Sequence, residues 1–335
     1  MIPKTELKLG PHANDRKYSL FVGALGYEQR ASFIATKFRE LFDHGVVTVL
    51  DEVLRYSFEA NRAVFHAIGV DEVGGGDTGA REFFTSWHRE HPGIDYAQFS
   101  IAIDISSMTR SRLANIVLGL CDLSALAGEG ISVDFLYAPG DYSPADGDDL
   151  ITEISEPVTP EFAGWSENPD APTSLVIGVG YESEKALGAV EYLDPAQIWC
   201  FVPTGEDGRY DADVESANET MWRSSPAAER IPYSVSEPES TFISLESLVY
   251  GLSRNSRPIL LPFGPKIFAL CTFLVGIVHS PRVIVWRVSG GAYTDYRDCV
   301  ASGKVISLPV IFESCKATDE SAAEIDQLGI MMLDR

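Results

Sequence analysis

Residues 104–110, which read Asp-Ile-Ser-Ser-Met-Thr-Arg, bring together the residue types that bind an anion. They follow an apolar run that predicts a strand and precede residues 111–123, which predict a helix. Backbone N–H groups and hydroxyls at such a helix N-terminus suit an anion, and Arg110 adds positive charge. Helix capping by Ser107 or Thr109 beside a surface arginine is the alternative explanation. The candidate ligand-binding residues of this segment are Asp104, Ser106, Ser107, Thr109 and Arg110.

Two glycine turns, in residues 23–28 and 178–182, each lead from an apolar run into Tyr-Glu and a helix-like stretch. A tyrosine there could stack on a base, and Glu28 could accept a hydrogen bond from a ribose or act as a catalytic carboxylate. The glutamate is also explained by its favourable interaction with a helix N-terminus. Arg30 and Lys185 could touch phosphate or pair with neighbouring acids. The candidate residues of the two turns are Gly26, Tyr27, Glu28, Gly180 and Tyr181.

A third loop, Gly264-Pro-Lys266, has in the second part of the chain the place that residues 104–110 have in the first. Gly264 and Lys266 are its candidate ligand-binding residues, with Lys266 in the basic position. The loop is not a P-loop, because it lacks the upstream glycine and the following Ser or Thr. The glycine turns also lack the GxGxxG pattern of dinucleotide-binding proteins. We therefore expect neither NAD nor ATP bound in the usual way, and no cofactor.

The strands that precede these loops recur in the same order along the chain. Residues 19–28 match 174–182, and residues 99–123 match 258–279, with an almost constant spacing. Short runs rich in Val, Ile and Leu alternate with helical patterns, which predicts parallel strands joined by crossover helices. Right-handed crossovers bring the carboxyl ends of such strands to one edge of the sheet, where ligands of open α/β sheets bind.

The predicted fold class is α/β, with two tandem Rossmann-like halves that have mainly parallel sheets and are related by internal duplication. The first half spans residues 1–145 and the second spans 173–312, with a linker over 146–172. Residues 313–335 form a tail that contains a helix-like segment at 321–328. The predicted ligand site is the cleft in which the strand ends of the two halves meet.

The composition fits a globular protein and limits its partners. Hydrophobic residues make up 45% and charged residues 22% of the 335 residues. A net charge of −23 disfavours direct binding to DNA or RNA, which needs clustered basic side chains. No apolar run is long enough for a membrane span and no secretion signal is visible, so we expect a cytoplasmic protein. The five cysteines and six histidines lack zinc-binding spacing, so no metal site is expected.

The order of Asp104, small and hydroxyl residues, Thr109 and Arg110 between a strand and a helix resembles the signature of CARF domains. These domains are Rossmann-like sensors of cyclic oligonucleotides in prokaryotic antiviral systems, and their segment typically reads Asp-x-Thr-Gly-Gly-Thr-Lys. Residues 106–108 depart from that pattern where glycines are expected. Two tandem units in one chain are similar to the SAVED domain, which is a fused pair of CARF-like units. The resemblance implies a nucleotide ligand and covers the order of strands over residues 17–290.

We therefore expect a nucleotide-sensing or regulatory subunit, possessing no chemistry of its own, that binds an anionic nucleotide between the halves. No effector domain is visible in the chain, so the output would pass through a partner protein or a homo-oligomer. The first alternative is an enzyme that cleaves a phosphodiester or glycosidic bond of a nucleotide with Glu28 or Asp104. The second alternative is a non-catalytic structural subunit of a complex.

Overall fold

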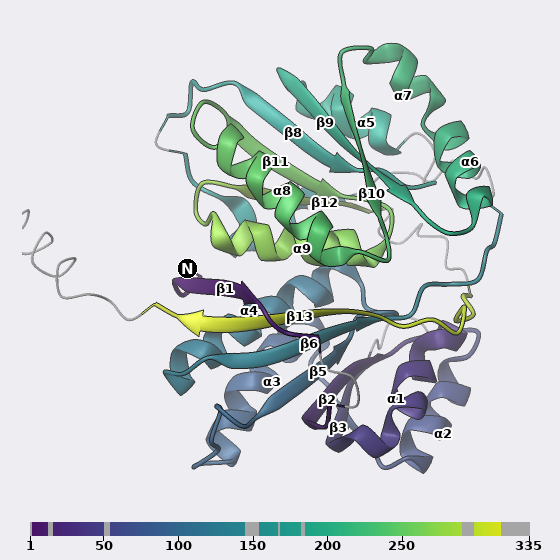
Figure 1. The fold of residues 1–335 in the computed structure, drawn as a ribbon, viewed down its shortest axis with the longest axis vertical. Coiled ribbons are helices and arrows are strands. Elements are labelled where there is room, and N and C mark those ends of the chain that lie inside the picture. Colours follow the sequence, from purple (N-terminus) through teal and green to yellow (C-terminus); the bar gives the residue numbers. More distant parts are fainter. Residues whose placement is uncertain are drawn as a thin grey trace, which may run out of the picture.

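The computed structural model describes residues 2–12, 16–49, 54–144, 154–166, 168–181, 185–289 and 298–315. In these ranges the chain forms two sheets, one above the other in Figure 1, with helices between and around them. The helices are α1 (Phe33–Lys37), α2 (Phe58–Ala67), α3 (Gly76–Glu90), α4 (Arg110–Ala127), α5 (Lys185–Leu193), α6 (Gly208–Ala217), α7 (Glu219–Ser224), α8 (Pro238–Leu252) and α9 (Lys266–Val278), and the 3-10 helices are η1 (Gln29–Ser32), η2 (Arg39–Leu41) and η3 (Pro160–Ala163).

The first sheet runs in the order β1-β13-β6-β5-β2-β3-β4. The strands from β6 to β4 are parallel, whereas β13 is antiparallel to both β6 and β1. Its strands are β1 (Thr5–Leu9), β2 (Tyr18–Leu25), β3 (Phe42–Val49), β4 (Asp71–Val73), β5 (Ser100–Asp104), β6 (Ile131–Tyr137) and β13 (Ile306–Ser314).

The second sheet runs in the order β10-β9-β8-β11-β12-β7. The strands from β10 to β12 are parallel, and β7 is antiparallel to β12. Its strands are β7 (Ile154–Pro157), β8 (Thr173–Gly178), β9 (Gln197–Thr204), β10 (Glu229–Ser234), β11 (Arg257–Pro262) and β12 (Ile284–Ser289).

Both sheets have the same parallel core, since β6-β5-β2-β3-β4 corresponds strand for strand to β12-β11-β8-β9-β10. In each half the first strand of the core lies next to the fourth, and the strand order reverses between them. This is the doubly wound order of Rossmann-like proteins, in which ligands bind at the point of reversal. The predicted α/β fold with two tandem Rossmann-like halves is therefore confirmed, and the common strand order agrees with internal duplication.

The helices form three layers around the two sheets. Buried residues of α3, α4, α8 and α9 belong to one continuous core between the sheets. Helices α1 and α2 cover the other face of the first sheet, and α5, α6 and α7 cover the other face of the second. Figure 1 shows α8 and α9 on the side of the upper half that faces the lower one. The two halves therefore share a core instead of meeting only through a linker.

Helix α9 is apolar on every side, and its position explains why. All residues from Ile267 to Ile277 are buried, because α9 packs on its own sheet on one side and on the first half on the other. A helix that is hydrophobic all round is one that is buried all round. Each fully buried Leu or Phe side chain in it contributes roughly 1.5–3 kcal/mol relative to exposure.

Two edge strands correct the predicted domain boundaries. The predicted second half includes residues 306–312, but β13 pairs with β6 and β1 in the first sheet, as the yellow arrow in Figure 1 shows. Part of the predicted linker, β7, pairs with β12 in the second sheet. The apolar pattern of a strand reveals its burial but not its partner, so these non-local pairings were missed. The helix-like segment at 321–328 lies outside the described residues.

Among the described residues, no helix combines the length and apolar character that a membrane span requires.

Candidate functional site

Lys266, at the start of α9, crosses from the second half into the first. Its Nζ donates to Glu28 Oε1 at 3.0 Å and to the Ser106 carbonyl oxygen at 2.6 Å. Glu28 follows β2 and Ser106 follows β5, which are the two strands on either side of the switch point of the first sheet. The lysine therefore joins the strand ends of one half to the helix N-terminus of the other.

Arg110 makes the reciprocal contact from the first half. It is the first residue of α4, as Lys266 is of α9, and its Nη2 donates to the Gly264 carbonyl oxygen at 3.1 Å. The two basic residues thus reach across the interface in opposite directions from equivalent positions. These contacts bring together five of the predicted residues, Glu28, Ser106, Arg110, Gly264 and Lys266.

Glu28 and Arg30 form a buried ion pair beside Lys266. Arg30 Nε donates to Glu28 Oε2 at 2.5 Å, and Arg30 Nη1 donates to the Ala138 carbonyl oxygen at 2.9 Å. The side chains of Glu28 and Arg30 are 11% and 8% exposed, and that of Lys266 is 22% exposed. Pairing with a neighbouring acid, one of the two roles considered for Arg30, is what the structure shows.

Burial and charge act against each other on the pKa values of these groups. Burial favours a higher pKa for Glu28, but the charges of Lys266 and Arg30 outweigh it and lower that pKa below its usual value. Burial lowers the pKa of Lys266, and the carboxylate of Glu28 opposes this shift. Glu28 is therefore ionised at neutral pH and acts as the counter-ion of two cations.

Asp104, at the end of β5, has the opposite electrostatic character. Burial raises its pKa to about 6, although hydrogen bonds from Ser106 and the charges of Arg30 and Lys266 oppose the shift. Its Oδ1 accepts the backbone N–H of Ser106 at 2.9 Å, which fixes the turn after the strand. Glu28, Arg30, Asp104 and Lys266 are called the charge cluster below.

The hydroxyl residues of the 104–110 segment hold the loop in place. Ser106 Oγ accepts the backbone N–H of Ala138 at 2.8 Å, and Ser107 Oγ donates to the Ala24 carbonyl oxygen at 3.2 Å. Thr109 Oγ1 accepts the N–H of Arg112 and caps α4, so the capping explanation is confirmed for Thr109 but not for Ser107. All three hydroxyls therefore have structural hydrogen bonds in this conformation.

Two buried asparagines, absent from the sequence analysis, anchor the glycine turns. Asn61 Nδ2 donates to the carbonyl oxygens of Gly26 and Glu28 at 2.9 and 2.8 Å. In the second half, Asn218 Nδ2 donates to the Gly180 carbonyl oxygen at 2.7 Å. Both asparagines are buried in helical surroundings, where a polar amide is retained only when it is hydrogen-bonded. An asparagine after a matching strand in each half was the available sequence signal.

The two candidate tyrosines lie in aromatic contacts rather than in one common position. The ring of Tyr27 is 6.1 Å from that of Tyr56, whereas Tyr181 stacks on Tyr210 at 6.1 Å and is 39% exposed. Tyr210 donates its hydroxyl to the Gly140 carbonyl oxygen at 3.2 Å and so bridges to the first half. Glu182, the counterpart of Glu28, lies outside the described residues.

A strap formed by residues 298–302 covers the start of η1, and no sequence pattern had indicated it. Asp298 Oδ1 accepts the backbone N–H of Gln29 at 2.7 Å, and the Cys299 carbonyl oxygen accepts that of Arg30 at 3.0 Å. On its other side the strap bonds to residues 139–141, with Ser302 N–H donating to the Pro139 carbonyl oxygen at 2.9 Å. The strap therefore connects the start of η1, including Arg30 of the charge cluster, to residues 139–141.

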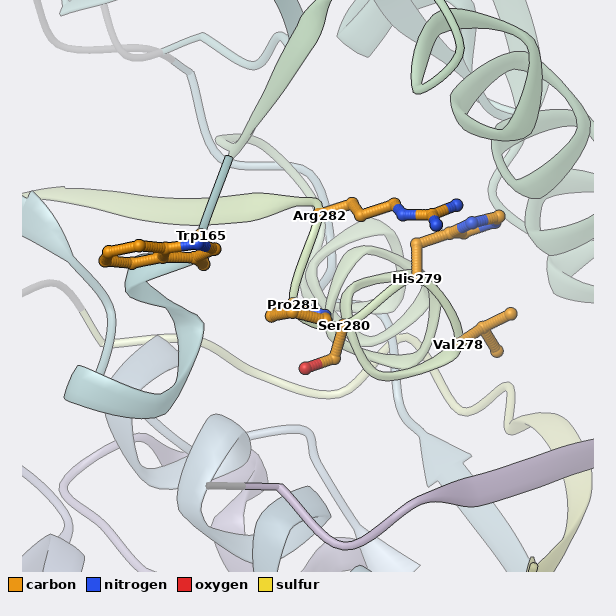
Figure 2. Close-up of a pocket in the computed structure, with 6 residues that line it drawn as sticks. All are labelled: Trp165, Val278, His279, Ser280, Pro281 and Arg282. Atoms are coloured by element: carbon orange, nitrogen blue, oxygen red, sulfur yellow. The ribbon is translucent and has the colours of Figure 1, made fainter. Parts of the chain in front are cut away.

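Two surface cavities lie away from the charge cluster. The smaller has a volume of about 250 Å³, and Figure 2 shows its lining. There the Trp165 ring and the Arg282 guanidinium point in opposite directions, so the aromatic and charged groups do not converge on one place. The larger, of about 590 Å³, lies where His12, Lys37 and Lys304 come together. Within the described ranges, no group of His, Cys, Asp or Glu is arranged to hold a metal ion.

Comparison with known proteins adds little to this geometry. No protein-family model matches the chain, and no curated protein matches it either. Among solved structures, it is similar to leucoanthocyanidin reductase from Vitis vinifera in a binary complex with NADPH, at 9% sequence identity. The match covers 80% of this chain and 92% of that one, with a TM-score of 0.24, which is too low to carry an argument. The fold and site alone define the class: a tandem Rossmann-like protein with a charge cluster between its halves.

Proposed function

We propose that this chain is a nucleotide-sensing or regulatory protein that binds an anionic nucleotide at the charge cluster. The observation that carries the proposal is the reciprocal crossing of Lys266 and Arg110 at the switch point. Open α/β sheets bind nucleotides at that position, and a phosphate arriving there would meet both residues and Arg30. This is a local concentration of positive charge in a chain with a net charge of −23.

Glu28 is the group that a nucleotide phosphate would replace. Its carboxylate now supplies the negative charge next to Lys266 Nζ, at 3.0 Å. A phosphate has more acceptor oxygens and more charge than a carboxylate, and charge-assisted hydrogen bonds to phosphate are among the strong ones. Replacement of Glu28 by a ligand would change the contact between the halves, and this change is the proposed signal.

The output of the signal would pass through a partner protein or through association of copies of the chain. The resemblance of residues 104–110 to CARF domains implies that the nucleotide is a cyclic oligonucleotide and that the system is a prokaryotic antiviral one. In that resemblance the residues that match by type are Asp104, Thr109 and Arg110. The protein would then be the sensing subunit, acting in the cytoplasm.

A thermal-shift screen against mono-, di- and cyclic oligonucleotides tests this proposal. A ligand present at a hundred times its Kd should stabilise the wild type by about 2.7 kcal/mol. We expect the shift to vanish in the double variant Lys266→Gln, Arg110→Gln, compared with that variant's own ligand-free midpoint. Lys8→Gln, which removes an exposed lysine paired with Glu313, is the control and should keep the shift. No shift with any nucleotide in the wild type would contradict the proposal.

An enzyme that cleaves a nucleotide is the second candidate, and the opposed pKa values of Glu28 and Asp104 favour it. Two carboxyl groups whose surroundings push their pKa values apart can serve as base and acid. Both carboxyl groups are buried and hydrogen-bonded here, so substrate would first have to displace their partners. Incubation of the protein with any nucleotide that binds, followed by chromatography, separates the two functions, because only an enzyme forms product. Product formation by such an enzyme should be lost in Glu28→Gln or Asp104→Asn.

A further inference from the structure

The larger of the two cavities lies at the boundary between the halves, outside the charge cluster. Its volume is about 590 Å³, which is in the range of small-molecule sites. Ser236 comes from the second half, two residues after the end of β10, and the rest of the lining comes from the first half and the residues that follow the strap. The side chains that matter for the argument are His12, Lys37, Phe38, Ser236, Lys304 and Ser307. We call this space the basic cavity.

The charge of the lining is unusual for this chain. Acidic residues outnumber basic ones by 49 to 26 in the sequence, yet the residues that line the basic cavity include two lysines and a histidine and no carboxylate. Such a bias is what a site for an anion needs, because clustered cations raise the local concentration of negatively charged ligands.

Lys37 contacts a backbone carbonyl oxygen and an aromatic ring, and neither group carries a negative charge. Its Nζ donates to the Gly303 carbonyl oxygen at 3.1 Å and lies 5.4 Å from the centre of the Phe33 ring. Among the described residues, no carboxylate forms an ion pair with Lys37. Because Gly303 directly precedes Lys304, this contact brings the Lys37 ammonium beside the second lysine of the lining.

The other two basic side chains of the lining are paired with exposed carboxylates of the second half. Lys304 pairs with Glu206, and His12 Nε2 lies 2.8 Å from Glu239 Oε1. Exposed ion pairs of this kind contribute between about 0 and 1 kcal/mol, so an anion of higher charge can compete with them. Both pairs also join the two halves, because Glu206 and Glu239 belong to the second half.

We propose that the basic cavity binds a small phosphate-bearing molecule, at a site separate from the charge cluster. Lysine ammonium groups bind phosphate as compact point charges. The hydroxyls of Ser236 and Ser307 supply further hydrogen bonds, and the ring of Phe38 offers an apolar surface for the organic part of the ligand. A ligand that contacts Lys304 also contacts the residues that follow the strap, so binding here would hold the strap against the first half.

Isothermal titration of the full chain with inorganic phosphate, pyrophosphate and AMP tests the site. We expect at least one of these probes to bind the wild type at a single site. The affinity of that probe should fall at least tenfold in the double variant Lys37→Gln, Lys304→Gln. It should fall by a smaller factor in the single variant Lys304→Gln, which alters only an exposed side chain. Lys8→Gln should bind as the wild type does. The melting temperatures of all variants, measured in parallel, show that each is folded.

The variant Lys266→Gln separates this inference from the proposed function. A probe bound in the basic cavity should bind Lys266→Gln with unchanged affinity. The opposite result is a probe that loses affinity in Lys266→Gln and keeps it in the double variant Lys37→Gln, Lys304→Gln. Such a probe binds at the charge cluster, which supports the proposed function and overturns this inference. The absence of binding by all three probes to the wild type would also overturn it.

Discussion

The two halves of the molecule share one strand order and differ in the chemistry of the loop at each switch point. In the first half, Asp104, Ser106 and Ser107 close the loop with hydrogen bonds. In the second half, the equivalent loop is Pro262-Phe-Gly264, in which Phe263 is buried and its N–H donates to the Gly178 carbonyl oxygen. One loop is polar and ionisable, and the other is apolar and tightly packed.

This difference shows that one strand order accommodates two chemically different loops. The ionisable groups of the charge cluster come from the first half, apart from Lys266. The second half contributes that lysine and the Gly264 carbonyl oxygen that accepts from Arg110. The loop before Lys266 is closely packed, because Phe263 is buried and Gly264 lies against the Val179 carbonyl oxygen.

Removal of the Glu28 charge should have the largest effect on stability. The change Glu28→Gln removes the carboxylate that pairs with both Arg30 and Lys266, and leaves Asp104 as the remaining carboxyl group of the charge cluster. Loss of one partner of a buried pair typically costs about 3–5 kcal/mol. Urea denaturation should show this loss, and the second change Lys266→Gln in the same chain should restore part of it. An equal loss in the single and double variants would show that Glu28 and Lys266 are not coupled.

The pH dependence of stability should differ between wild type and Asp104→Asn. Burial raises the pKa of Asp104 from 3.8 to about 6, so the folded state holds this proton more tightly than the unfolded state does. The resulting stabilisation is complete below pH about 4 and is lost as the pH rises through about 6, a change of roughly 3 kcal/mol. Glu28 has the opposite sign, because its pKa is lowered: its contribution is lost as the pH falls below its ordinary pKa.

Denaturation midpoints of the two proteins from pH 4 to pH 7.5 measure this difference. The wild type should lose stability relative to Asp104→Asn across this range. Parallel curves would contradict a raised pKa for Asp104.

A methyl group at Gly264 should test the tight packing of the second loop. Gly264 has φ of +68°, and a Cβ there would lie 2.4 Å from the Val179 carbonyl oxygen. The matched control is Gly128, whose φ is +66° but whose Cβ would meet nothing within 4 Å. Both changes to Ala introduce left-handed strain of about 1–2 kcal/mol, and only Gly264→Ala adds a backbone clash. Thermal unfolding should rank Gly264→Ala as clearly the more destabilised, and equal losses would contradict the packing described.

The smallest expected effect concerns the starts of the two equivalent helices. Thr109 caps α4 through its side chain, whereas Pro265, at the same position before α9, makes no side-chain cap. Thr109→Ala should therefore destabilise the protein by about 1 kcal/mol. Pro265→Ala removes no capping bond and should cost less. Chemical denaturation compares the two, and the reverse order would show that the capping bond of Thr109 is unimportant.

Local sequence patterns were sufficient for the parallel core and for part of the charge cluster. The matching runs around β2 and β8, and around β5 and β11, predicted both switch points, and Arg110 and Lys266 were found as equivalent basic residues. These features depend on residues close together in the chain, whose periodicity and spacing are visible in the sequence.

Contacts between distant segments could not be predicted in the same way. The pairing of β13 with β6, the strap over η1, and the ion pair of Lys266 with Glu28 each join segments that are far apart in sequence. A strand pattern says that a segment is buried in a sheet but not in which sheet, and a lysine pattern does not say which carboxylate it meets. Such pairings depend on the packing of the whole molecule.

The most direct test of the central claim is the affinity of a nucleotide for wild type and for Lys266→Gln, measured by isothermal titration calorimetry. The nucleotide is the one that gives the largest thermal shift in the screen. If it binds at the charge cluster, the variant should bind it at least tenfold more weakly, because a charge-assisted hydrogen bond is lost. An unchanged Kd in Lys266→Gln would contradict the claim that nucleotide is bound where the two halves meet.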